Sequence, residues 1–487
     1  MPAKFYDTLL GEYIKNPGVR GISLDKLSGK DFGYRMISYD DITNKNKINF
    51  KDVDLKKAAI YSGEDVYITN LLYEKHKKDK TNENKVLNEI ELPLIQVLKK
   101  MEIDGVHIDA DTLKGIGILL DHEIKRLEKS IYDEVEQEFN ISSPKQVGEI
   151  LFDKLALPKG KKTKTGYSVS ADVLGELAHD YPIAQKIVDY RHYTKLQSTY
   201  IEGLLNQIDE NGLVHTNYNS AISSTGRLSS TDPNLQNIPN SDGIAGEIRG
   251  AFVSRFEKGK IIALDYSQVE VRILAIMSGD KNLLDAFQNG LDIHHRTAEF
   301  IFPGKTITNS ERKIAKGVNF GVIYGISGFG LAQMLGINMK DAKAYIDKFF
   351  ESYPDVKLFL DNTIKFCEEN NYVETMFGRR RYINGINDLN RIVKSSAERE
   401  AINMPIQGTS ADIIKIAMIK SYEFLEKNNL KSKMIMQVHD ELVFDVYPGE
   451  EKIISNEIKD IMQNILTNKP ITLKVDYGEG NSWREAK

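Results

Sequence analysis

The chain is organised around the stretch KIIALDYSQVEVRILAIM, residues Lys260 to Met277. Its apolar run Ile261 to Leu264 predicts a short buried strand, and that strand ends on an acid, Asp265. Apolar residues then recur at helical spacing as far as Ile276, and Ser267 stands at the N-cap position of the predicted helix. The pattern therefore places a carboxylate at a strand tip, where it either has a chemical role or only caps the helix.

Two polar residues follow Asp265 closely enough to reach the same cavity. Glu270 lies on the first turn of the predicted helix, and Gln268 precedes it as an uncharged partner. Divalent cations such as Mg²⁺ prefer oxygen ligands, and a site for them normally draws on carboxylates. A metal site at this strand tip therefore requires a second carboxylate from elsewhere in the chain.

The composition is that of an ordinary globular protein. With 487 residues, 41% hydrophobic and 28% charged, the chain is long enough for two to four domains, and it is neither disordered nor fibrous. No apolar run approaches the roughly 20 residues that a bilayer span requires, and the N-terminal residues lack a signal-peptide pattern. We therefore expect a cytoplasmic protein that has no membrane partner.

Cysteine content and charge narrow the classes of site further. Cys367 is the only cysteine, so neither an intrachain disulfide nor a cysteine-based zinc site is possible. The net charge of -5 does not by itself suggest a nucleic-acid partner, because such proteins are basic at least locally. Any basic surface must therefore be confined to one part of the molecule.

The first 85 residues predict a helix-rich layer without an obvious first element. Tyr61, Glu64 and Asp65 share one helical segment, and Asp7 follows an aromatic pair. The run from His76 to Lys85 is polar and lacks apolar periodicity, so it is the best linker candidate.

Residues 86 to about 206 are predominantly helical by their spacing, with one cationic interruption. The loop around Gly160 is rich in lysine and in turn-forming residues, which suits contact with a phosphate backbone; the alternative is an ordinary solvated loop. Arg191 on the following helix extends the positive strip. The candidate DNA-binding cations of this region are Lys161, Lys162, Lys164 and Arg191.

Strand alternation at residues 212–220 is followed by a long irregular segment, AISSTGRLSSTDPNLQNIP. Irregular segments of this length inside compact domains are usually functional. Arg227, Asn234, Gln236 and Asn237 supply donors for phosphates and base edges, and the alternative is that their side chains only stabilise the loop.

The second strong signal is SERKIAKGVNFGVIYG. Arg312, Lys316, Phe320 and Tyr324 repeat every fourth residue, so two cations and two aromatic rings lie along one helix face. That face suits a nucleoside triphosphate, because the cations neutralise phosphate oxygens and an aromatic ring stacks on a base. A preceding helix carries His294 and its neighbour, but no third ligand stands at zinc spacing.

The missing carboxylate comes from the C-terminal region. KMIMQVHDELVFDV alternates on both sides of His439, Asp440 and Glu441, which predicts a hairpin with acids at its tip. Together with Asp265, it predicts two carboxylates on adjacent strands that hold divalent metal ions. Upstream, three polar residues again stand four apart, just before Pro405 and Gly408 are expected to disturb their helix: Arg399, Asn403 and Gln407.

DYSQVEVR, RKIAKGVNFGVIYG and QVHDELVF, in this order, resemble the three polymerase motifs of the bacterial DNA polymerase I family, also called family A. TGRLSSTDPNLQNIP, DIHHRTA, INMPIQGTSADIIK and KLQSTY are also similar to family segments in family order. The resemblance implies an α+β right-hand polymerase fold, with an antiparallel sheet in the palm and helical fingers and thumb. It places the thumb at 86–206, the palm at 207–285 and 405–487, and the fingers at 286–404.

Carried over position by position, the resemblance implies a metal site and a nucleotide site. Asp265, Asp440 and the Tyr266 carbonyl match the metal ligands, and Glu441 supports them. Three residues of one helix match the positions that hold the triphosphate and its base: Arg312, Lys316 and Phe320. Four more positions face the phosphates, the sugar or the nascent base pair: His294, Gln268, Glu270 and Tyr324. Glu270 matches the residue that blocks a ribose 2′-hydroxyl.

The remaining matches concern DNA. Five positions match family residues that touch the primer-template near its growing end: Arg227, Arg399, Asn403, Gln407 and His439. The implied function is a DNA polymerase that extends a primer 3′-hydroxyl with two Mg²⁺ ions, acting as a monomer on primer-template DNA and deoxynucleoside triphosphates. A phage-type RNA polymerase and a non-catalytic DNA-binding remnant are the alternatives. Glu270 argues against the first, and the intact pair Asp265 and Asp440 argues against the second.

Residues 1–85 resemble the second half of the family's α/β 3′–5′ exonuclease domain. Asp7 and Asp65 match two of its metal ligands, and Tyr61 matches its tyrosine. The Asp and Glu of the domain's first strand would lie upstream of Met1. We therefore expect a truncated, inactive exonuclease-like domain without proofreading, either trimmed or naturally reduced.

Overall fold

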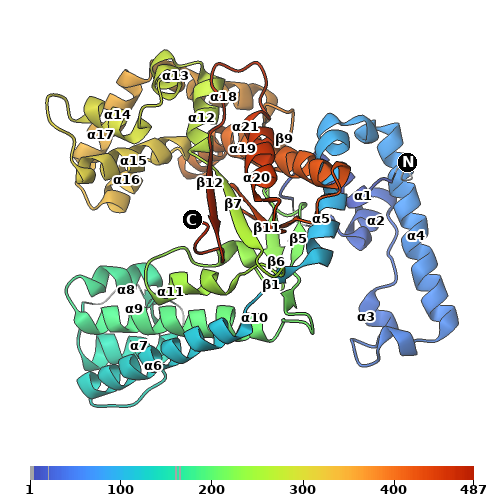
Figure 1. Ribbon diagram of the computed structural model, residues 1–487, viewed down its shortest axis with the longest axis horizontal. Helices are drawn as coiled ribbons and strands as arrows, with labels where there is room; N and C mark the ends of the chain where they lie inside the picture. The colour runs from blue at the N-terminus through green and yellow to red at the C-terminus, as the bar shows by residue number, and fades with distance from the viewer. Residues whose placement is uncertain (1–4, 20, 159–161, 164–165) are drawn as a thin grey trace.

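The computed structural model describes residues 5–19, 21–158, 162–163 and 166–487. At its centre lies a four-stranded antiparallel sheet in the order β10-β11-β7-β12. The strands are β7 (Lys260–Tyr266), β10 (Lys433–Val438), β11 (Glu441–Val446) and β12 (Val475–Gly480). Helical layers surround the sheet (Figure 1). This is the α+β architecture expected from the sequence.

The continuous apolar run of β7 is explained by burial on both faces. Ile262, Leu264 and Tyr266 belong to one hydrophobic core, whereas Ile261 and Ala263 belong to a second core on the other face. Side chains alternate between the two faces of a strand, so both faces of this one must be apolar. The same alternation places Asp265 on the side of Ile261 and Ala263.

The first core contains the helices of the predicted fingers and palm, shown in the upper part of Figure 1. They begin with α12 (Val269–Ser278), α13 (Lys281–Gln288), α14 (Ile293–Ile301) and α15 (Asn309–Ile323). They continue with α16 (Gly328–Leu335), α17 (Met339–Ser352), α18 (Pro354–Asn370) and α19 (Arg391–Lys427). The hairpin β8 (Tyr372–Glu374) and β9 (Arg380–Tyr382) connects α18 to α19, and α20 (Glu451–Ile453) and α21 (Lys459–Gln463) precede β12.

The helices of the predicted thumb form a separate layer at the lower left of Figure 1. They are α6 (Ala110–Val135), α7 (Pro144–Gly148), α8 (Ala171–Ala178), α9 (Pro182–Lys195) and α10 (Gly203–Leu205), with the small hairpin β2 (Lys162–Thr163) and β3 (Gly166–Tyr167). Asp109 caps α6 by accepting hydrogen bonds from two backbone amides of its first turn. α5 (Leu92–Asp104) lies in the predicted thumb segment but packs on α19 and β10.

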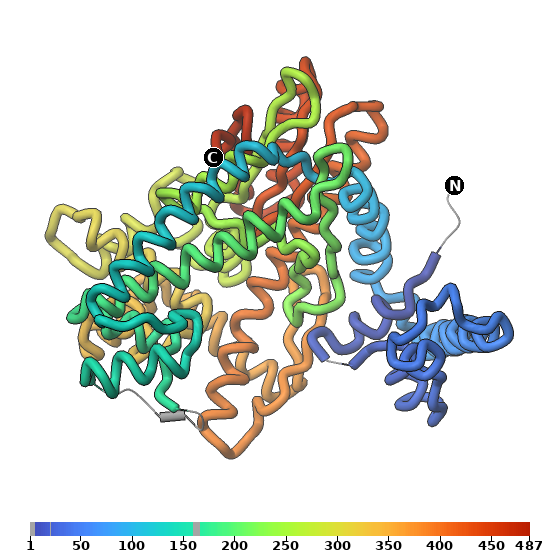
Figure 2. Tube along the Cα trace, turned by 90° about the horizontal axis from the view of Figure 1, so that it is seen from below, coloured from blue at the N-terminus to red at the C-terminus, as the bar shows by residue number. Residues whose placement is uncertain are grey.

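Short paired strands and one short helix connect these layers. β1 (Val106–His107) pairs with β4 (Leu213–Val214), and β5 (Asn217–Asn219) pairs with β6 (Ser229–Thr231), all antiparallel. α11 (Ile244–Glu247) follows. The N-terminal segment contributes α1 (Thr8–Lys15), α2 (Leu24–Phe32), α3 (Tyr39–Ile42) and α4 (Leu55–Lys78). Figure 2 shows this segment on the far side of the body from the thumb helices.

Three local predictions were wrong. Ser267 does not cap α12: its amide donates to the carbonyl of Lys474, and Gln268, with φ 51°, takes the N-cap position. Pro405 does not interrupt the helix, because α19 runs through it and burial around it outweighs a cost of about 3 kcal/mol. The expected linker does not begin at His76, which lies buried in α4.

The domain boundaries proposed from the resemblance stay predictions. One of them, between residues 404 and 405, falls inside the continuous helix α19. No helix in the described part of the chain is both long and apolar enough for a membrane span.

Candidate active site

The two aspartates expected to bind metal lie at the same end of the strands of the central sheet. β11 pairs with β7 so that Glu441 lies opposite Asp265, and the Tyr266 amide donates to the Asp440 carbonyl at 3.1 Å. Ser410 of α19 donates to Oδ1 of Asp440 at 3.2 Å. The hairpin with acids at its tip is therefore confirmed, and it lies beside the strand tip that carries Asp265.

The charge of this acidic cluster is not balanced. Burial raises the pKa of Asp265 to about 6, and the negative charges of Glu441 and Asp440 add to the rise, while Lys487 opposes it. Burial without a matching cation disfavours the ionised carboxylate. The Asp265 carboxyl therefore keeps its proton to a higher pH than an exposed aspartate does.

A cavity of about 700 Å³ opens over these acids. It is lined by residues from β7, the β10–β11 turn, α12, the end of α15 and the loop after β6. Twelve predicted site residues line it: Arg227, Gln236, Asn237, Asp265, Tyr266, Gln268, Glu270, Phe320, Tyr324, His439, Asp440 and Glu441. The volume lies in the range of small-molecule pockets, about 300–1,000 Å³.

Glu270 is buried at the wall of this cavity and is held on both carboxylate oxygens. Nη2 of Arg227 donates to Oε1 at 2.7 Å, and the hydroxyl of Tyr324 donates to Oε2 at 2.9 Å. Only 5% of Glu270 is exposed, and burial raises its pKa although Arg227 and Tyr324 oppose the rise. The two donors fix the carboxylate in one orientation.

Helix α15 presents the expected face of cations and aromatic rings. A capping box of Thr308 and Glu311 begins the helix, and Tyr324 follows its last residue. Nε of Arg312 donates to Asp292 at 2.6 Å, so this cation already has a partner, whereas Lys316 is exposed. The cavity that holds the two aspartates is lined by Phe320 and Tyr324 but not by Arg312 or Lys316.

His294 lies behind Phe320, not on the cavity wall. The two rings have centroids 5.8 Å apart, and Nδ1 of His294 lies 2.8 Å from the side-chain amide of Asn319. Burial lowers the pKa of His294 to about 4, so the ring is neutral at pH 7. His294 therefore contacts Phe320 and does not line the cavity, and its contact with a nucleotide stays a prediction.

Helix α19 carries the predicted DNA-contact stripe. Asn403 and Gln407 are partly accessible and Arg399 is exposed, while the intervening residues from Ala401 to Ile406 are otherwise buried. Oδ1 of Asn403 is buried without a hydrogen-bond partner. The end of α15 packs here, because a Cβ on Gly325 would lie 3.0 Å from the Arg399 side chain.

The other predicted DNA contacts have mixed positions. Asn234 accepts a hydrogen bond from the Gln236 amide, so its side chain stabilises the loop, and Gln236 donates to Gln437. Arg191 donates to the carbonyl of Val169 at 2.9 Å. Lys161 and Lys164 lie outside the described residues, and Lys162 is described only as part of β2. Their DNA contacts stay predictions.

Among the residues that sequence reasoning missed are three around Glu441. Nε1 of Trp483 donates to Oε1 of Glu441 at 2.9 Å, and Nζ of Lys487 lies 2.8 Å from Oε2. The guanidinium of Arg249 stacks on the Trp483 ring at 3.8 Å and lines the cavity. Trp483 is the only tryptophan, which was the one available signal, since nothing in local spacing links it to Glu441.

The N-terminal acids do not share a cavity of this kind. Asp7 caps α1 by accepting from the Leu10 amide and lines one cavity, while Asp65 lines another with Tyr6 and Tyr73. Tyr61 packs against Phe50 and Tyr39. A nuclease site built from these residues is not assembled here, and the absence of proofreading stays a prediction.

The model of DNA polymerase family A matches residues 110–485. The chain belongs to DNA polymerase family A. Within the family it is 48% identical over 405 residues to DNA polymerase I of Lactococcus lactis subsp. lactis, covering 82% of this chain and 46% of that protein. It is 43% identical over 493 residues to DNA polymerase I of Bacillus subtilis, covering 99% of this chain and 55% of that protein. The chain thus spans about half the length of these family A relatives.

A solved family structure has the same fold. The POL domain of Pol1 from M. smegmatis, in complex with DNA primer-template and dNTP, is 34% identical to this chain. The TM-score is 0.87, and the match covers 99% of this chain and 82% of that one. The right-hand polymerase fold of family A is therefore the fold of this chain.

Proposed function

We propose that this chain is a template-directed DNA polymerase that adds deoxynucleotides to a primer 3′-hydroxyl and releases pyrophosphate. The observation that carries the proposal is the meeting of Asp265 and Asp440 in one cavity with Glu270 and the end of α15. Its proposed partners are those printed for the solved relative, DNA primer-template and dNTP. A monomer in the cytoplasm remains part of the same proposal.

The residues present fit a divalent metal of the Mg²⁺ type. Asp265 and Asp440, with the Tyr266 carbonyl, offer only oxygen donors, and the pKa of Asp265 is raised by burial and then by the negative charges of Glu441 and Asp440. Among the described residues, no group of three or more His, Cys, Asp or Glu side chains is arranged to hold a metal. Mg²⁺ is usually held by one or two carboxylates plus substrate phosphates, so a complete protein cage is not required.

Two such ions, when bound, would neutralise charge on the attacking and leaving oxygens of phosphoryl transfer. The chain's own residues position the reactants. Trp483 and Lys487 hold Glu441 beside the aspartates, and Lys316 on the exposed face of α15 is free to neutralise the triphosphate. Arg312 joins it by exchanging Asp292 for a phosphate, because a guanidinium binds both groups with the same geometry.

The sugar and the base are selected on the other wall. Phe320 presents its ring to the incoming base, and the neutral His294 supports that ring from behind. Glu270, fixed by Arg227 and Tyr324, fills the space in which a ribose 2′-hydroxyl would lie. The stripe on α19 is proposed to contact the primer-template beside Tyr324.

Primer extension separates the candidate functions. Extension with deoxynucleotides and strong discrimination against ribonucleotides is the expected result. Efficient extension with ribonucleotides would assign the chain to the RNA polymerases instead. DNA binding without extension by either set would make it a non-catalytic remnant.

A further inference from the structure

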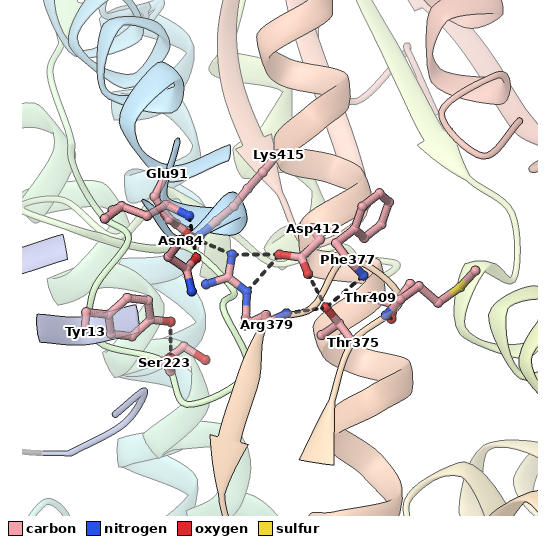
Figure 3. Close-up of polar contacts among 12 residues, drawn as sticks. Tyr13, Asn84, Glu91, Ser223, Thr375, Phe377, Arg379, Thr409, Asp412 and Lys415 are labelled. Carbon is pink, nitrogen blue, oxygen red and sulfur yellow. Dashed lines mark hydrogen bonds and ion pairs between the residues drawn. The ribbon is translucent and has the colours of Figure 1, made fainter. Parts of the chain in front are cut away.

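Among its contacts with the rest of the chain, the N-terminal segment touches one tight turn. The hydroxyl of Tyr13, a fully buried residue of α1, donates to the carbonyl of Ser223 at 2.6 Å (Figure 3). The same carbonyl accepts from the Gly226 amide at 3.4 Å, which closes the turn Ser223–Gly226. Arg227, the partner of Glu270, is the next residue along the chain.

The turn also packs closely against Arg379 and helix α19. Gly226 has φ +85°, and a Cβ there would lie 2.8 Å from Nε of Arg379, so the turn lies directly on this guanidinium. On α19, a Cβ at Gly408 would lie 3.3 Å from the Thr225 carbonyl. These two contacts leave the turn little freedom on the side of α19.

Arg379 is held in a buried ion network of two positive and two negative side chains, although its Nη1 has no hydrogen-bond partner among the described residues. Its guanidinium contacts Glu91 and Asp412, and Lys415 donates to the same Glu91 oxygen at 2.7 Å. All four side chains are completely buried, two positive and two negative (Figure 3). A buried ion network of this kind stays in one arrangement, since losing any partner leaves an unpaired charge.

The N-terminal segment closes the remaining side of the turn. In addition to the Tyr13 hydrogen bond, Gly18 lies close to the turn. A Cβ on Gly18 would be 2.4 Å from Cβ of Ser224. Ser223 and Thr225 bind each other through their hydroxyls at 3.0 Å inside the turn. The turn is therefore held between α1 and Arg379.

We infer that Tyr13 is a positioning residue for sugar selection, acting through the Ser223–Gly226 turn on Arg227 and so on the Glu270 carboxylate. The inference rests on the proposed function, because it assigns a role within that site. It gives the exonuclease-like segment a task that needs no nuclease activity. When the turn loosens, Arg227 orients Glu270 less strictly, and a ribose 2′-hydroxyl is excluded less well.

The test is the ratio of deoxynucleotide to ribonucleotide incorporation by the intact chain. Tyr13→Phe removes only the hydroxyl, and losing one hydrogen bond should lower the ratio by about 2- to 10-fold. Tyr6→Phe is the matched control, since its hydroxyl binds His76 in the same segment without touching the turn. Its ratio should stay at the wild-type value, and a thermal unfolding measurement checks that both variants are folded.

A double-mutant cycle distinguishes positioning from general loosening. If Tyr13 acts through Glu270, Tyr13→Phe has no further effect on the ratio in a Glu270→Ala background. A second variant approaches the turn independently: Gly18→Ala should also lower the ratio, whereas Gly33→Ala should not. Gly33 also has a positive φ, +64°, but a Cβ there would meet no atom of the described residues within 4 Å, so this substitution strains the backbone without touching the turn.

The outcomes are distinct. The inference would be overturned by an unchanged ratio in both Tyr13→Phe and Gly18→Ala. It would also be overturned by a Tyr13→Phe effect that persists fully in the Glu270→Ala background. In either case, primer extension by the wild type would still support the proposed function. A wild-type chain that extends no primer would overturn both.

Discussion

Tyr324 and Glu270 are joined across the cavity wall by a hydrogen bond of 2.9 Å from the phenol to Oε2. Tyr324 follows the last residue of α15, and Glu270 lies in the first turn of α12, which comes shortly after Asp265 in the chain. Because Arg227 holds the other carboxylate oxygen, Glu270 is fixed between two elements that are remote in sequence. We propose that this buried, oriented carboxylate acts as a steric wall against a ribose 2′-hydroxyl.

Glu270→Ala should therefore relax sugar selection. Removing the side chain opens space beside the second carbon of the sugar, and we expect ribonucleotide incorporation relative to deoxynucleotide to rise by about 10- to 200-fold. Glu270→Gln keeps the size and serves as the matched control, with a much smaller change. Measured incorporation ratios that are equal in wild type and Glu270→Ala would remove this residue from sugar selection.

The Phe320 ring leads to a prediction about chain terminators. A phenyl ring has no polar atom to replace the missing 3′-hydroxyl of a dideoxynucleotide, so the wild type should discriminate against these substrates. In Phe320→Tyr one added hydrogen bond should improve dideoxynucleotide use by about 10- to 100-fold. Phe329→Tyr, on the exposed side of α16, is the control. An unaltered ratio of dideoxy- to deoxynucleotide incorporation would mean that Phe320 does not face the sugar.

The N-terminal segment should not shorten DNA. Asp7 caps a helix, and Asp65 lies on another cavity, so the pair does not form a metal site by itself. A labelled primer with a 3′ mismatch, incubated with the protein and Mg²⁺ but without nucleotides, should keep its length. Progressive shortening would show that other acids complete a nuclease site.

The pH dependence of metal use follows from Asp265. Burial and its acidic neighbours raise its pKa to about 6, so below that pH a cation must displace a proton to bind. The Mg²⁺ concentration for half-maximal extension should rise as the pH falls below about 6, by up to ~10-fold per unit. A Mg²⁺ requirement that is constant from about pH 7 to about pH 5 would contradict this assignment.

The same shift has a consequence for stability without metal. A folded pKa above the ordinary value means that the ionised Asp265 destabilises the fold, and this cost grows as the pH rises toward about 6 and is constant above it.

Much of the fold and site could be predicted from local sequence patterns. The strand before Asp265, the hairpin at Asp440 and the spacing from Arg312 to Tyr324 all depend on periods of two or about four residues, and the structure has each of them. The resemblance to family motifs then supplied their joint arrangement. Neither signal depends on distant contacts.

The missed features are long-range contacts without a local pattern. Trp483 meets Glu441 from 42 residues away, and Tyr13 meets Ser223 from 210 residues away. The error at Pro405 has the same origin, since its helix is kept by burial against other elements. The linker prediction failed at His76 because the buried hydrogen bond of this residue is made with Glu12, 64 residues upstream. No local pattern indicates such a contact.

We propose that Asp265 and Asp440 form the metal site of a DNA polymerase. The most direct measurement is primer extension by Asp265→Asn and Asp440→Asn, together with DNA binding. Asp476→Asn is the matched control, because Asp476 lies opposite Asp265 on β12 but is exposed and does not line the cavity. Both active-site variants should lose extension and keep DNA affinity, and Asp476→Asn should keep both. Near wild-type extension by Asp265→Asn or Asp440→Asn would contradict the assignment of these two aspartates to a metal site.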